Sequence, residues 1–353
     1  MISIVLGTRP EIIKMAPVIR VCEQKSVPYS ILHTGQHYSY DMDRIFFEDL
    51  KLPLPDYNLD VGSGTHAEQT GAIMKGIEKV YLQNVPDVIL VQGDTNTVLA
   101  GGLVGAKMQI PVGHVEAGLR SYDRKMPEEI NRVIVDHISD YLFAPTNNSY
   151  QNLIQEGIDD SKIFITGNTI VDALIQNYEI AKEKSTILQQ IGLIPRQYLL
   201  VTVHRAENVD IKNRLEGIIS GIRQVGISYD LPVIFPMHPR TQKKIQEFNI
   251  SSEGLTIISP TGYLDFLELE AHARLILTDS GGVQEEACIL QVPCVTLREN
   301  TERPETVDVG ANILAGSNMD QITDNAEKME LSSRSWVNPY GDGTAGEKII
   351  ESI

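Results

Sequence analysis

The sequence alternates short runs of apolar, β-branched residues with segments of helical periodicity. In the first half these runs are residues 2–6, 29–34, 88–91, 111–115, 141–144 and 163–166. In the second half they are residues 198–203, 233–237, 255–258, 275–277, 293–297 and 311–314. Strands that alternate with helices form parallel sheets covered by helices on both faces. The sequence therefore predicts an α/β protein with two doubly wound, Rossmann-like domains of six strands each.

The boundary between the predicted domains is expected at residues 167–168, where the sixth run ends and a helical stretch from about residue 170 to about residue 191 begins. A chain of 353 residues has the length of about two ordinary domains. We therefore predict an N-terminal domain at residues 1–168 and a C-terminal domain at residues 169–339. Sheets of this kind bind ligands at the carboxyl ends of their strands, so the loops that follow strands are expected to hold the chemistry.

Composition excludes several classes of partner. The net charge is −17, and no basic stripe is present to bind nucleic acid or an anionic membrane. No apolar run approaches the about 18 to 20 residues that a membrane helix needs. The three cysteines, Cys22, Cys288 and Cys294, are odd in number and have no metal-ligand spacing, so we expect packed thiols in a reducing compartment. The prediction is a cytoplasmic protein without a metal site.

The segment Ser280-Gly281-Gly282 lies between a predicted strand and a predicted helix. Glycines let the backbone approach a ligand closely, and the N–H groups at a helix start favour phosphate. A tight turn that needs glycine for its own geometry is the alternative. Glu286, farther along the same helix, is placed to accept hydrogen bonds from a ribose diol, although a solvated carboxylate would look the same.

Cationic residues follow several predicted strands. Arg9 and Lys14 flank the first strand-to-helix turn, His204 and Arg205 follow the first strand of the second domain, and Arg303 follows the fifth. Each alone is more often an ordinary surface residue. Together, in a chain of charge −17, they favour a site for an anion such as a diphosphate.

Three carboxylates are candidates for acid–base chemistry. Asp94 and Glu116 end neighbouring apolar strands, where a carboxylate is partly desolvated, and Glu128 opens a helix after Pro127. The alternative for Asp94 is to cap the helix that follows it. Capping and dipole stabilisation is likewise the alternative for Glu128 and Glu129.

The sequence contains no usable nicotinamide-binding motif. Residues 341–346 match the spacing of the dinucleotide-binding glycines, but no strand precedes them and too few residues follow for a βαβ unit. The histidines outside the strand-end loops show no metal-ligand spacing. No cofactor is therefore predicted.

Nine segments, in this order, resemble the non-hydrolysing UDP-N-acetylglucosamine 2-epimerases along nearly the whole chain. They are residues 7–14, 34–37, 92–95, 114–120, 127–132, 166–172, 204–208, 279–286 and 301–305. The resemblance implies two domains of the GT-B type with the active site in the cleft between them, and a last helix, about residues 340–353, that packs back on the first domain. It also implies a homodimer and a role in polysaccharide biosynthesis. Because a reactive glycal intermediate must be kept from water, we also expect domain closure to be coupled to catalysis.

The chemistry of such an epimerisation follows from the substrate. The C2 proton of the sugar has no neighbouring carbonyl and is not acidic. If UDP leaves C1 first, the developing positive charge at C1 acidifies the C2 proton, and elimination gives a 2-acetamidoglucal. Return of a proton to the opposite face of C2, and of UDP to C1, gives UDP-N-acetylmannosamine. The route needs leaving-group stabilisation and carboxylates but no cofactor.

The resemblance assigns roles to matching residues. It places Arg9, Lys14, His204, Ser280, Gly281, Gly282 and Arg303 around the diphosphate, Phe266 at the uracil and Glu286 on the ribose. Asp94, Glu116 and Glu128, together with His204, form the catalytic group; which carboxylate removes the C2 proton and which returns it stays open. Gln36, His37, Arg205 and His238 match a second, activating UDP-N-acetylglucosamine site, but Tyr38 stands where the family has Arg.

Three other functions stay open. A hydrolysing relative would release N-acetylmannosamine and UDP by the same elimination. A GT-B glycosyltransferase would share the nucleotide site but would need an acceptor groove and no set of three carboxylates. A catalytically silent nucleotide-sugar sensor is disfavoured by the presence of Asp94, Glu116 and Glu128.

Overall fold

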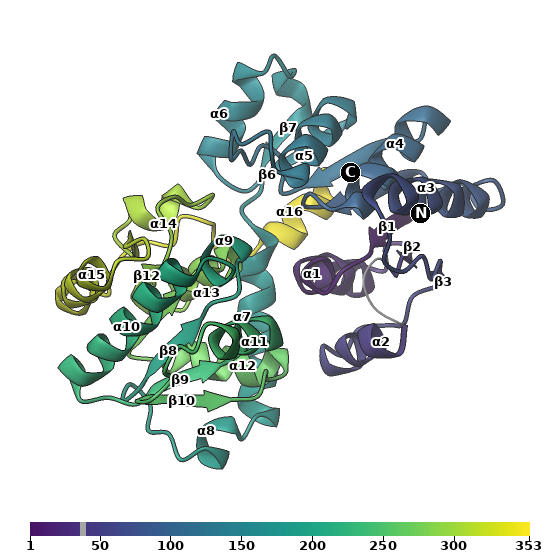
Figure 1. Ribbon diagram of the computed structural model, residues 1–353. Helices are drawn as coiled ribbons and strands as arrows, with labels where there is room; N and C mark the ends of the chain where they lie inside the picture. Colours follow the sequence, from purple (N-terminus) through teal and green to yellow (C-terminus); the bar gives the residue numbers. More distant parts are fainter. Residues whose placement is uncertain (36–39) are drawn as a thin grey trace. The chain divides into compact units, whose positions relative to one another are not determined.

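The structure, a computed structural model, describes residues 1–35 and 40–353, and for residues 40–43 the backbone alone. The chain divides into two compact units: residues 1–176 with 340–353, and residues 177–339. The division falls within helix α7 (Thr169–Lys184), eight residues beyond the predicted boundary at residue 168. Each unit contains one parallel sheet with helices (Figure 1).

The first unit has seven strands in the order β3-β2-β1-β4-β5-β6-β7. The strands are β1 (Ile2–Leu6), β2 (Tyr29–His33), β3 (Tyr57–Asn58), β4 (Val88–Gln92), β5 (Val112–Val115), β6 (Tyr141–Ala144) and β7 (Ile163–Ile165). The helices are α1 (Arg9–Lys25), α2 (Tyr40–Asp49), α3 (His66–Tyr81), α4 (Asn96–Met108), α5 (Pro127–Ile138), α6 (Asn147–Gln155), the first part of α7 and α16 (Ala345–Glu351), with a 3-10 turn η1 (Asp160–Lys162). The central strands β1 and β4 are buried along their full length.

The second unit has six strands in the order β10-β9-β8-β11-β12-β13. The strands are β8 (Leu199–Thr202), β9 (Val233–Pro236), β10 (Leu255–Ile258), β11 (Leu275–Thr278), β12 (Cys294–Thr296) and β13 (Asn312–Leu314). The helices are the end of α7, α8 (Ile187–Gln190), α9 (Ala206–Val209), α10 (Lys212–Tyr229), α11 (Pro239–Glu247), α12 (Tyr263–Ala271), α13 (Gly281–Ile289), α14 (Pro304–Asp308) and α15 (Met319–Leu331). Apolar layers lie on both faces of this sheet.

The twelve predicted strands are all present, and the predicted fold class is confirmed. Strand β3 was missed because its two residues, Tyr57 and Asn58, are too short for a periodic pattern. The single helix predicted to reach residue 191 was wrong, since the chain leaves the helix after Lys184. At the break, the Ser185 hydroxyl donates to Asp265 and accepts from the Ile187 N–H, so its side chain competes with the helical backbone.

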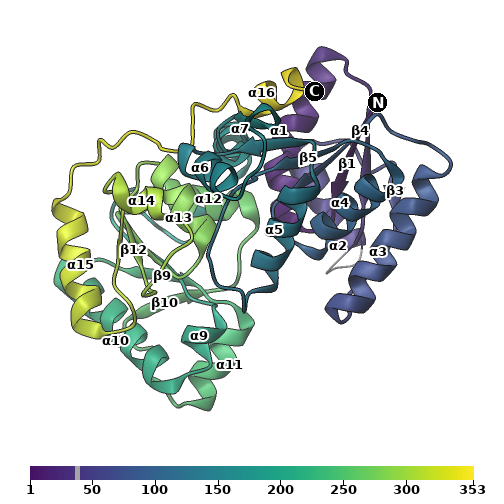
Figure 2. The same cartoon turned by 90° about the horizontal axis from the view of Figure 1, so that it is seen from above.

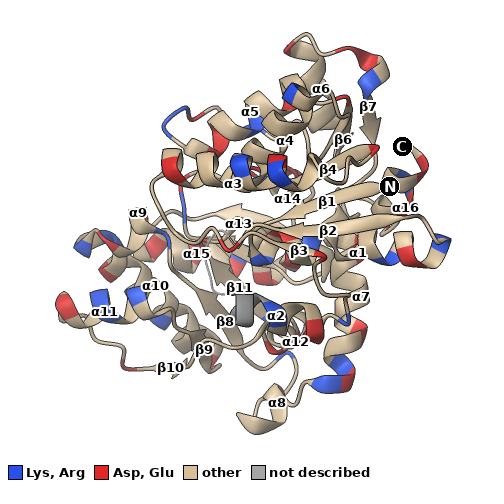
Figure 3. Ribbon diagram, turned by 90° about the vertical axis from the view of Figure 1, so that its right-hand side faces the viewer, with Lys and Arg blue, Asp and Glu red and all other residues tan. Residues whose placement is uncertain are grey.

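Lys, Arg, Asp and Glu residues lie on helices and loops, and strands β1, β2, β8 and β9 contain none of them (Figure 3). This distribution is that of sheets buried by helices on both faces. In the described part of the chain, no helix combines the length and apolar character needed to cross a membrane. The predicted packed thiols are confirmed, because Cys22, Cys288 and Cys294 are all buried and unbridged.

Helix α16 packs beside α1 in the first unit (Figure 2). Its first N–H groups, those of Ala345 and Gly346, donate to the Asp172 carboxylate at 3.2 and 2.9 Å. A side chain at Gly346 would approach the Pro17 backbone to about 3.1 Å, so glycine permits the close contact between the helices. The last segment of the chain thus completes the first unit.

Candidate functional site

In both sheets the strand order changes direction next to the central strand, between β1 and β4 and between β8 and β11. At these switch points the connections leave to opposite sides, which opens a crevice at the carboxyl ends of the strands. Arg9 and Asp94 follow β1 and β4, and His204 and Ser280 follow β8 and β11. The predicted residues therefore lie where doubly wound sheets bind ligands.

The Glu116 carboxylate is buried at the end of β5 and is held by donors from three other segments. Lys14 Nζ lies 2.6 Å from Oε1, Asn168 Nδ2 lies 3.4 Å from the same oxygen, and the Gln92 amide donates to Oε2. The Glu116 backbone has a φ of +73°, an uncommon conformation for a residue other than glycine. Such strain at a polar strand end is typical of functional sites.

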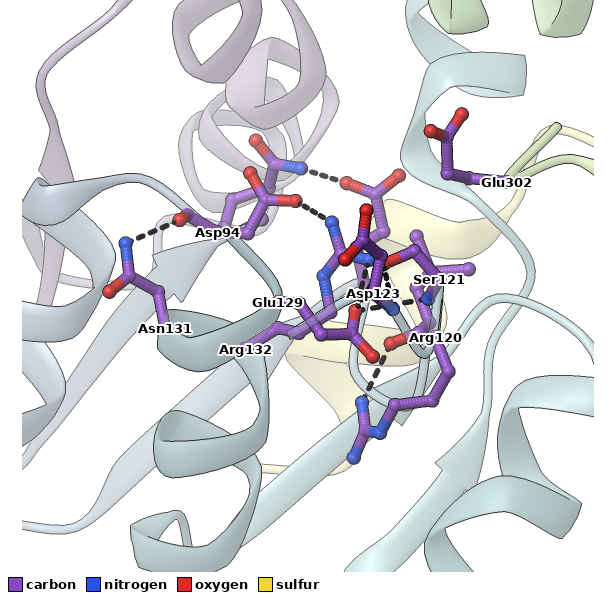
Figure 4. A network of polar contacts seen from close by, with 12 residues as sticks. Asp94, Arg120, Ser121, Asp123, Glu129, Asn131, Arg132 and Glu302 are labelled. Carbon is purple, nitrogen blue, oxygen red and sulfur yellow. Dashed lines mark hydrogen bonds and ion pairs between the residues drawn. The ribbon is translucent and has the colours of Figure 1, made fainter. Parts of the chain in front are cut away.

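Asp94 does not cap the helix that follows it. Thr95 is the N-cap of α4, and its hydroxyl accepts from the Val98 N–H, so the capping alternative for Asp94 was wrong. The Asp94 carboxylate forms an ion pair with Arg132, and the Asn131 amide donates to the Asp94 carbonyl oxygen at 2.8 Å (Figure 4). The side chain is 31% exposed, so it stays accessible to a ligand.

Helix capping and dipole stabilisation, the alternative role for Glu128 and Glu129, applies differently to the two residues. Glu129 is buried and accepts from the Ser121 and Tyr122 N–H groups and from Arg132, so it orders the preceding loop (Figure 4). Glu128 is exposed in the first turn of α5, where a carboxylate also favours the helix dipole.

Asp94 and Glu128 line one cavity of about 310 Å³. The other lining residues are polar or small and come mainly from the starts of α3, α4 and α5: Ser63, Gly64, His66, Gln69, Thr95, Asn96, Pro127 and Asn131. The cavity thus offers two carboxylates together with amide and imidazole groups, a lining suited to a hydroxylated ligand.

Glu11 is a buried carboxyl that the sequence analysis did not single out. It accepts from the Gly7 and Thr8 N–H groups at 2.5 and 3.0 Å and from the Thr95 hydroxyl at 2.5 Å. Burial raises the pKa of Glu11 to about 7, against the lowering effect of these hydrogen bonds. Glu11 joins the β1–α1 turn, which directly precedes Arg9, to the N-cap residue of α4.

Behind Glu116 lies a buried charged cluster that sequence reasoning also missed. His114 Nδ1 lies 2.6 Å from Asp136, and its Nε2 lies 2.8 Å from the Gly93 carbonyl oxygen. Arg120 Nη1 lies 2.7 Å from Asp136. Burial alone would raise the pKa of Asp136, but His114 and Arg120 hold it below its usual range. The cluster fixes the loop between Gln92 and Asp94.

In the second unit, Asp279 is fully buried and organises two loops. It accepts from the backbone N–H groups of His204 and Arg205 at 3.1 and 3.0 Å and from the Asn208 amide at 3.1 Å. These bonds tie the loop after β8 to the loop after β11. The imidazole of His204 is 45% exposed, and desolvation lowers its pKa despite the nearby Asp279.

The two glycines at the start of α13 are not required by the fold itself. Neither has a positive φ, and a Cβ would lie 3.9 Å from the nearest atom at Gly281 and 4.0 Å at Gly282. The turn therefore accepts a side chain without strain, which removes the argument for the tight-turn alternative. Ser280 is the N-cap residue, and its side chain makes no capping hydrogen bond.

Four predicted residues of the second unit line one cavity of about 250 Å³: His204, His238, Phe266 and Ser280. The rings of His204 and His238 lie 6.4 Å apart. The resemblance assigns His238 to a second ligand, and the structure brings it to the same cavity as the three residues assigned to UDP. Arg303 pairs with buried Glu285, Nε to Oε1 2.7 Å, at the start of α14. Glu286 lies partly buried on α13.

Comparisons with known proteins identify the family. A sequence model of the family described as UDP-N-acetylglucosamine 2-epimerase matches residues 20–353. A curated protein of this name from Methanocaldococcus jannaschii is 58% identical over 359 residues, which cover 100% of this chain and 98% of the relative. This chain belongs to the UDP-N-acetylglucosamine 2-epimerase family. The resemblance inferred from the nine segments is confirmed.

Solved structures and other relatives agree with the family assignment. A crystal structure of the Methanocaldococcus jannaschii UDP-GlcNAc 2-epimerase in complex with UDP-GlcNAc and UDP aligns with a TM-score of 0.90 at 57% identity, covering 99% of this chain and 98% of that one. A Pseudomonas aeruginosa protein named UDP-2,3-diacetamido-2,3-dideoxy-D-glucuronate 2-epimerase is 40% identical over 353 residues, covering 99% of this chain and 98% of the relative. The relatives of this chain thus carry names that refer to different UDP-sugars.

The residues matched to the family's second ligand site are only partly described. Gln36 and His37 lie outside the described residues. Arg205 is the N-cap residue of α9, and its N–H donates to Asp279. The assignment of Gln36, His37, Arg205 and His238 to a second ligand stays a prediction.

Arg9 of the first unit is matched to the diphosphate. Its guanidinium stacks over the Phe46 ring at 4.8 Å.

Proposed function

We propose that this protein interconverts UDP-N-acetylglucosamine and UDP-N-acetylmannosamine without hydrolysis and without a cofactor. The observation that carries this proposal is the set of first-unit carboxylates: Asp94 and Glu128 line one cavity, and Glu116 lies at the next strand end. In a member of this family, such a set provides proton acceptors and donors for C2, which a glycosyltransferase of the same fold does not need.

In the proposed reaction, the second unit holds UDP. The N–H groups of Gly281 and Gly282 at the start of α13 and the Ser280 hydroxyl would bind phosphate oxygens, with Phe266 against uracil and Glu286 on the ribose. Arg9, Lys14, Arg303 and His204 would stabilise the negative charge that develops as the bond between C1 and the UDP oxygen breaks.

The first-unit carboxylates would handle the C2 proton. Donors from Lys14, Gln92 and Asn168 stabilise Glu116 in its ionised form. Loss of the C2 proton to a carboxylate, as UDP leaves, gives the 2-acetamidoglucal; return of a proton to the other face and of UDP to C1 completes the inversion. We assign the two transfers to the group Asp94, Glu116 and Glu128 as a whole.

The remaining expectations are part of the same proposal. We infer a cytoplasmic homodimer that supplies an N-acetylmannosamine nucleotide for polysaccharide synthesis. We also propose that Gln36, His37, Arg205 and His238 contact a second, activating UDP-N-acetylglucosamine. Strictly hyperbolic kinetics, and a reverse reaction that needs no UDP-N-acetylglucosamine, would contradict the activation.

Proton NMR in deuterated water tests the reaction directly. Purified protein and UDP-N-acetylglucosamine, without added cofactor, should yield UDP-N-acetylmannosamine with deuterium at C2. Free N-acetylmannosamine and UDP would indicate the hydrolysing alternative, and no reaction would favour a glycosyltransferase. Turnover of UDP-2,3-diacetamido-2,3-dideoxy-D-glucuronate in preference to UDP-N-acetylglucosamine would assign a different sugar to the same chemistry.

The amide variants Asp94→Asn, Glu116→Gln and Glu128→Gln assign the chemistry to the first unit. Each should lose at least about a hundredfold in turnover, because a positioned acid or base contributes that much, while UDP affinity is retained. Glu347→Gln, on α16, is a control and should keep full activity. Unchanged turnover in all three site variants would exclude this mechanism.

A further inference from the structure

Glu270 on α12 is a fully buried carboxyl that the reaction proposed above does not use. Two other buried carboxylates show the usual pattern: Asp279 accepts from two N–H groups and an amide, and Glu129 accepts from two N–H groups and a guanidinium. Both Glu270 oxygens are buried without such a donor. A buried carboxylate without donors is costly, so the environment of Glu270 needs an explanation.

The partner of Glu270 is another carboxyl, Glu286 on α13, with which it shares a side-chain hydrogen bond. Helices α12 and α13 are in contact. Glu270 follows Phe266 by four residues and Glu286 follows Val283 by three, so each lies one helical turn from a residue that lines the 250 Å³ cavity. The pair therefore lies directly beside the surface proposed to bind the nucleoside.

A hydrogen bond between two carboxyl groups requires one proton. Burial and the negative field of Glu286 raise the pKa of Glu270 well above its usual range, so the proton belongs on Glu270. Tyr198 on β8 and Cys294 on β12 also interact electrostatically with Glu270. Burial raises the pKa of both, so both stay neutral near pH 7. With this proton in place, the pair carries a single negative charge.

We propose that Glu270 is a positioning residue: its carboxylic acid donates a hydrogen bond to one oxygen of Glu286 and leaves the other oxygen aimed at the ribose hydroxyls. This inference rests on the proposed role of Glu286 in UDP binding. Loss of the shared proton places two negative charges in contact, which displaces the Glu286 carboxylate. UDP affinity should therefore fall as the pH rises and the pair deprotonates.

Three variants separate positioning from mere packing. Glu270→Leu removes the donor but keeps an apolar side chain of similar size, so the fold should persist. Glu270→Gln restores a donor that cannot be lost at high pH. Glu268→Leu, a buried carboxyl two residues away on the same helix that faces His272 at 3.4 Å, is the matched control.

The measurement is the Kd of UDP and of 2′-deoxy-UDP, by calorimetry, between about pH 6 and about pH 8.5. Wild-type protein should prefer UDP, because Glu286 accepts from the 2′-hydroxyl. Glu270→Leu should lose about tenfold in UDP affinity and bind both ligands almost equally, since one hydrogen bond to a charged group is removed. Glu270→Gln should restore the preference, with a Kd that depends less on pH than that of wild-type protein. Glu268→Leu should match wild type.

An unchanged preference for UDP in Glu270→Leu, or an identical pH profile in wild type and Glu270→Gln, would overturn the positioning role. Infrared spectroscopy of the unliganded protein provides an independent readout. Wild-type protein should show the carbonyl stretch of a protonated carboxyl that is absent in Glu270→Gln, and its absence in wild type would overturn the shared proton. If wild-type protein shows this band but does not bind UDP, the proposed function fails and the positioning role fails with it, while the proton assignment stands.

Discussion

At the scale of single residues, the orientation of Glu116 depends on Gln92. The Gln92 amide is buried and donates to Oε2 of Glu116, while Lys14 Nζ lies 2.6 Å from Oε1. We expect Gln92→Leu to lower kcat by about tenfold to a hundredfold with little change in KM, because a hydrogen bond to a charged group is worth about 1.5–3 kcal/mol. The exposed Gln83→Leu variant is the control. If the fall in activity comes with a loss of thermal stability, Gln92 acts through the fold instead.

Glu11 makes the stability of the protein depend on pH. Its pKa is about 7 in the folded protein and 4.5 in an unfolded chain, so the folded state retains the proton longer. Between these values the folded protein binds more protons than the unfolded one, and the free energy of unfolding therefore falls as the pH rises. At about 1.4 kcal/mol per pKa unit, the loss between about pH 4.5 and about pH 7 is on the order of 3 kcal/mol.

The variant Glu11→Gln tests this dependence because it cannot ionise. Relative to the variant, wild-type protein should lose stability as the pH is raised from about 5 to about 8, and no further loss is expected at higher pH. Denaturant unfolding of both proteins across this range measures the difference, in which the other titrating groups cancel. A difference that stays constant with pH would show that Glu11 is ionised in both states.

At the scale of elements, the glycines at the start of α13 are not needed for folding but are proposed to be needed for UDP binding. Since a Cβ at Gly281 or Gly282 has no atom closer than 3.9 Å, alanine should leave stability unchanged or raise it by about 0.4–1 kcal/mol. UDP affinity should nevertheless fall by at least about tenfold, because the side chain occupies the path of the phosphate to the N–H groups.

A glycine-to-alanine substitution outside the candidate site is the control for this prediction. Gly71, in the exposed part of α3, has no atom within 4 Å of the position that a Cβ would take, and Gly71→Ala should leave UDP binding unchanged. Melting temperature and UDP titration of the three alanine variants provide the comparison. Retained UDP affinity in Gly281→Ala and Gly282→Ala would remove α13 from the phosphate site.

At the scale of the whole molecule, the attachment of α16 holds the two ends of the first unit together. Asp172→Ala removes the acceptor for the Ala345 and Gly346 N–H groups, and we expect a loss of about 1–3 kcal/mol. Hydrogen exchange should accelerate first in residues 345–351. Lys25→Met breaks only the exposed ion pair with Glu351 and should cost less than about 1 kcal/mol. Equal exchange in both variants would contradict the capping role of Asp172.

The fold was predictable because its signals are local and repeated. Each buried strand is an apolar run of ordinary length, whereas β3 is two residues long and the break before α8 depends on a contact between Ser185 and Asp265. Glu11 was within reach of sequence reasoning, since Thr8-x-x-Glu11 has the spacing of a capping box.

Other parts of the candidate site depend on contacts between residues that are far apart in the sequence, and such contacts leave no local sequence pattern. Arg132 meets Asp94 across 38 positions of sequence, and Glu286 meets Glu270 through the packing of two helices. The capping alternative for Asp94 failed for a related reason, because the choice between Asp94 and Thr95 as the helix cap is set by one residue of backbone register. Motif order therefore pointed to the candidate residues, whose roles stay predictions, and the structure was needed for their partners.

Because the first unit combines residues 1–176 with residues 340–353, its parts leave the ribosome at different times. Residues 177–339 emerge between them, and the second unit is contiguous. During synthesis the second unit can thus reach its native state before α16 is available to pack against α1. The face of α1 that packs against α16 stays uncovered until residues 345–351 have been made, so chaperone contacts during translation are expected to concentrate on α1.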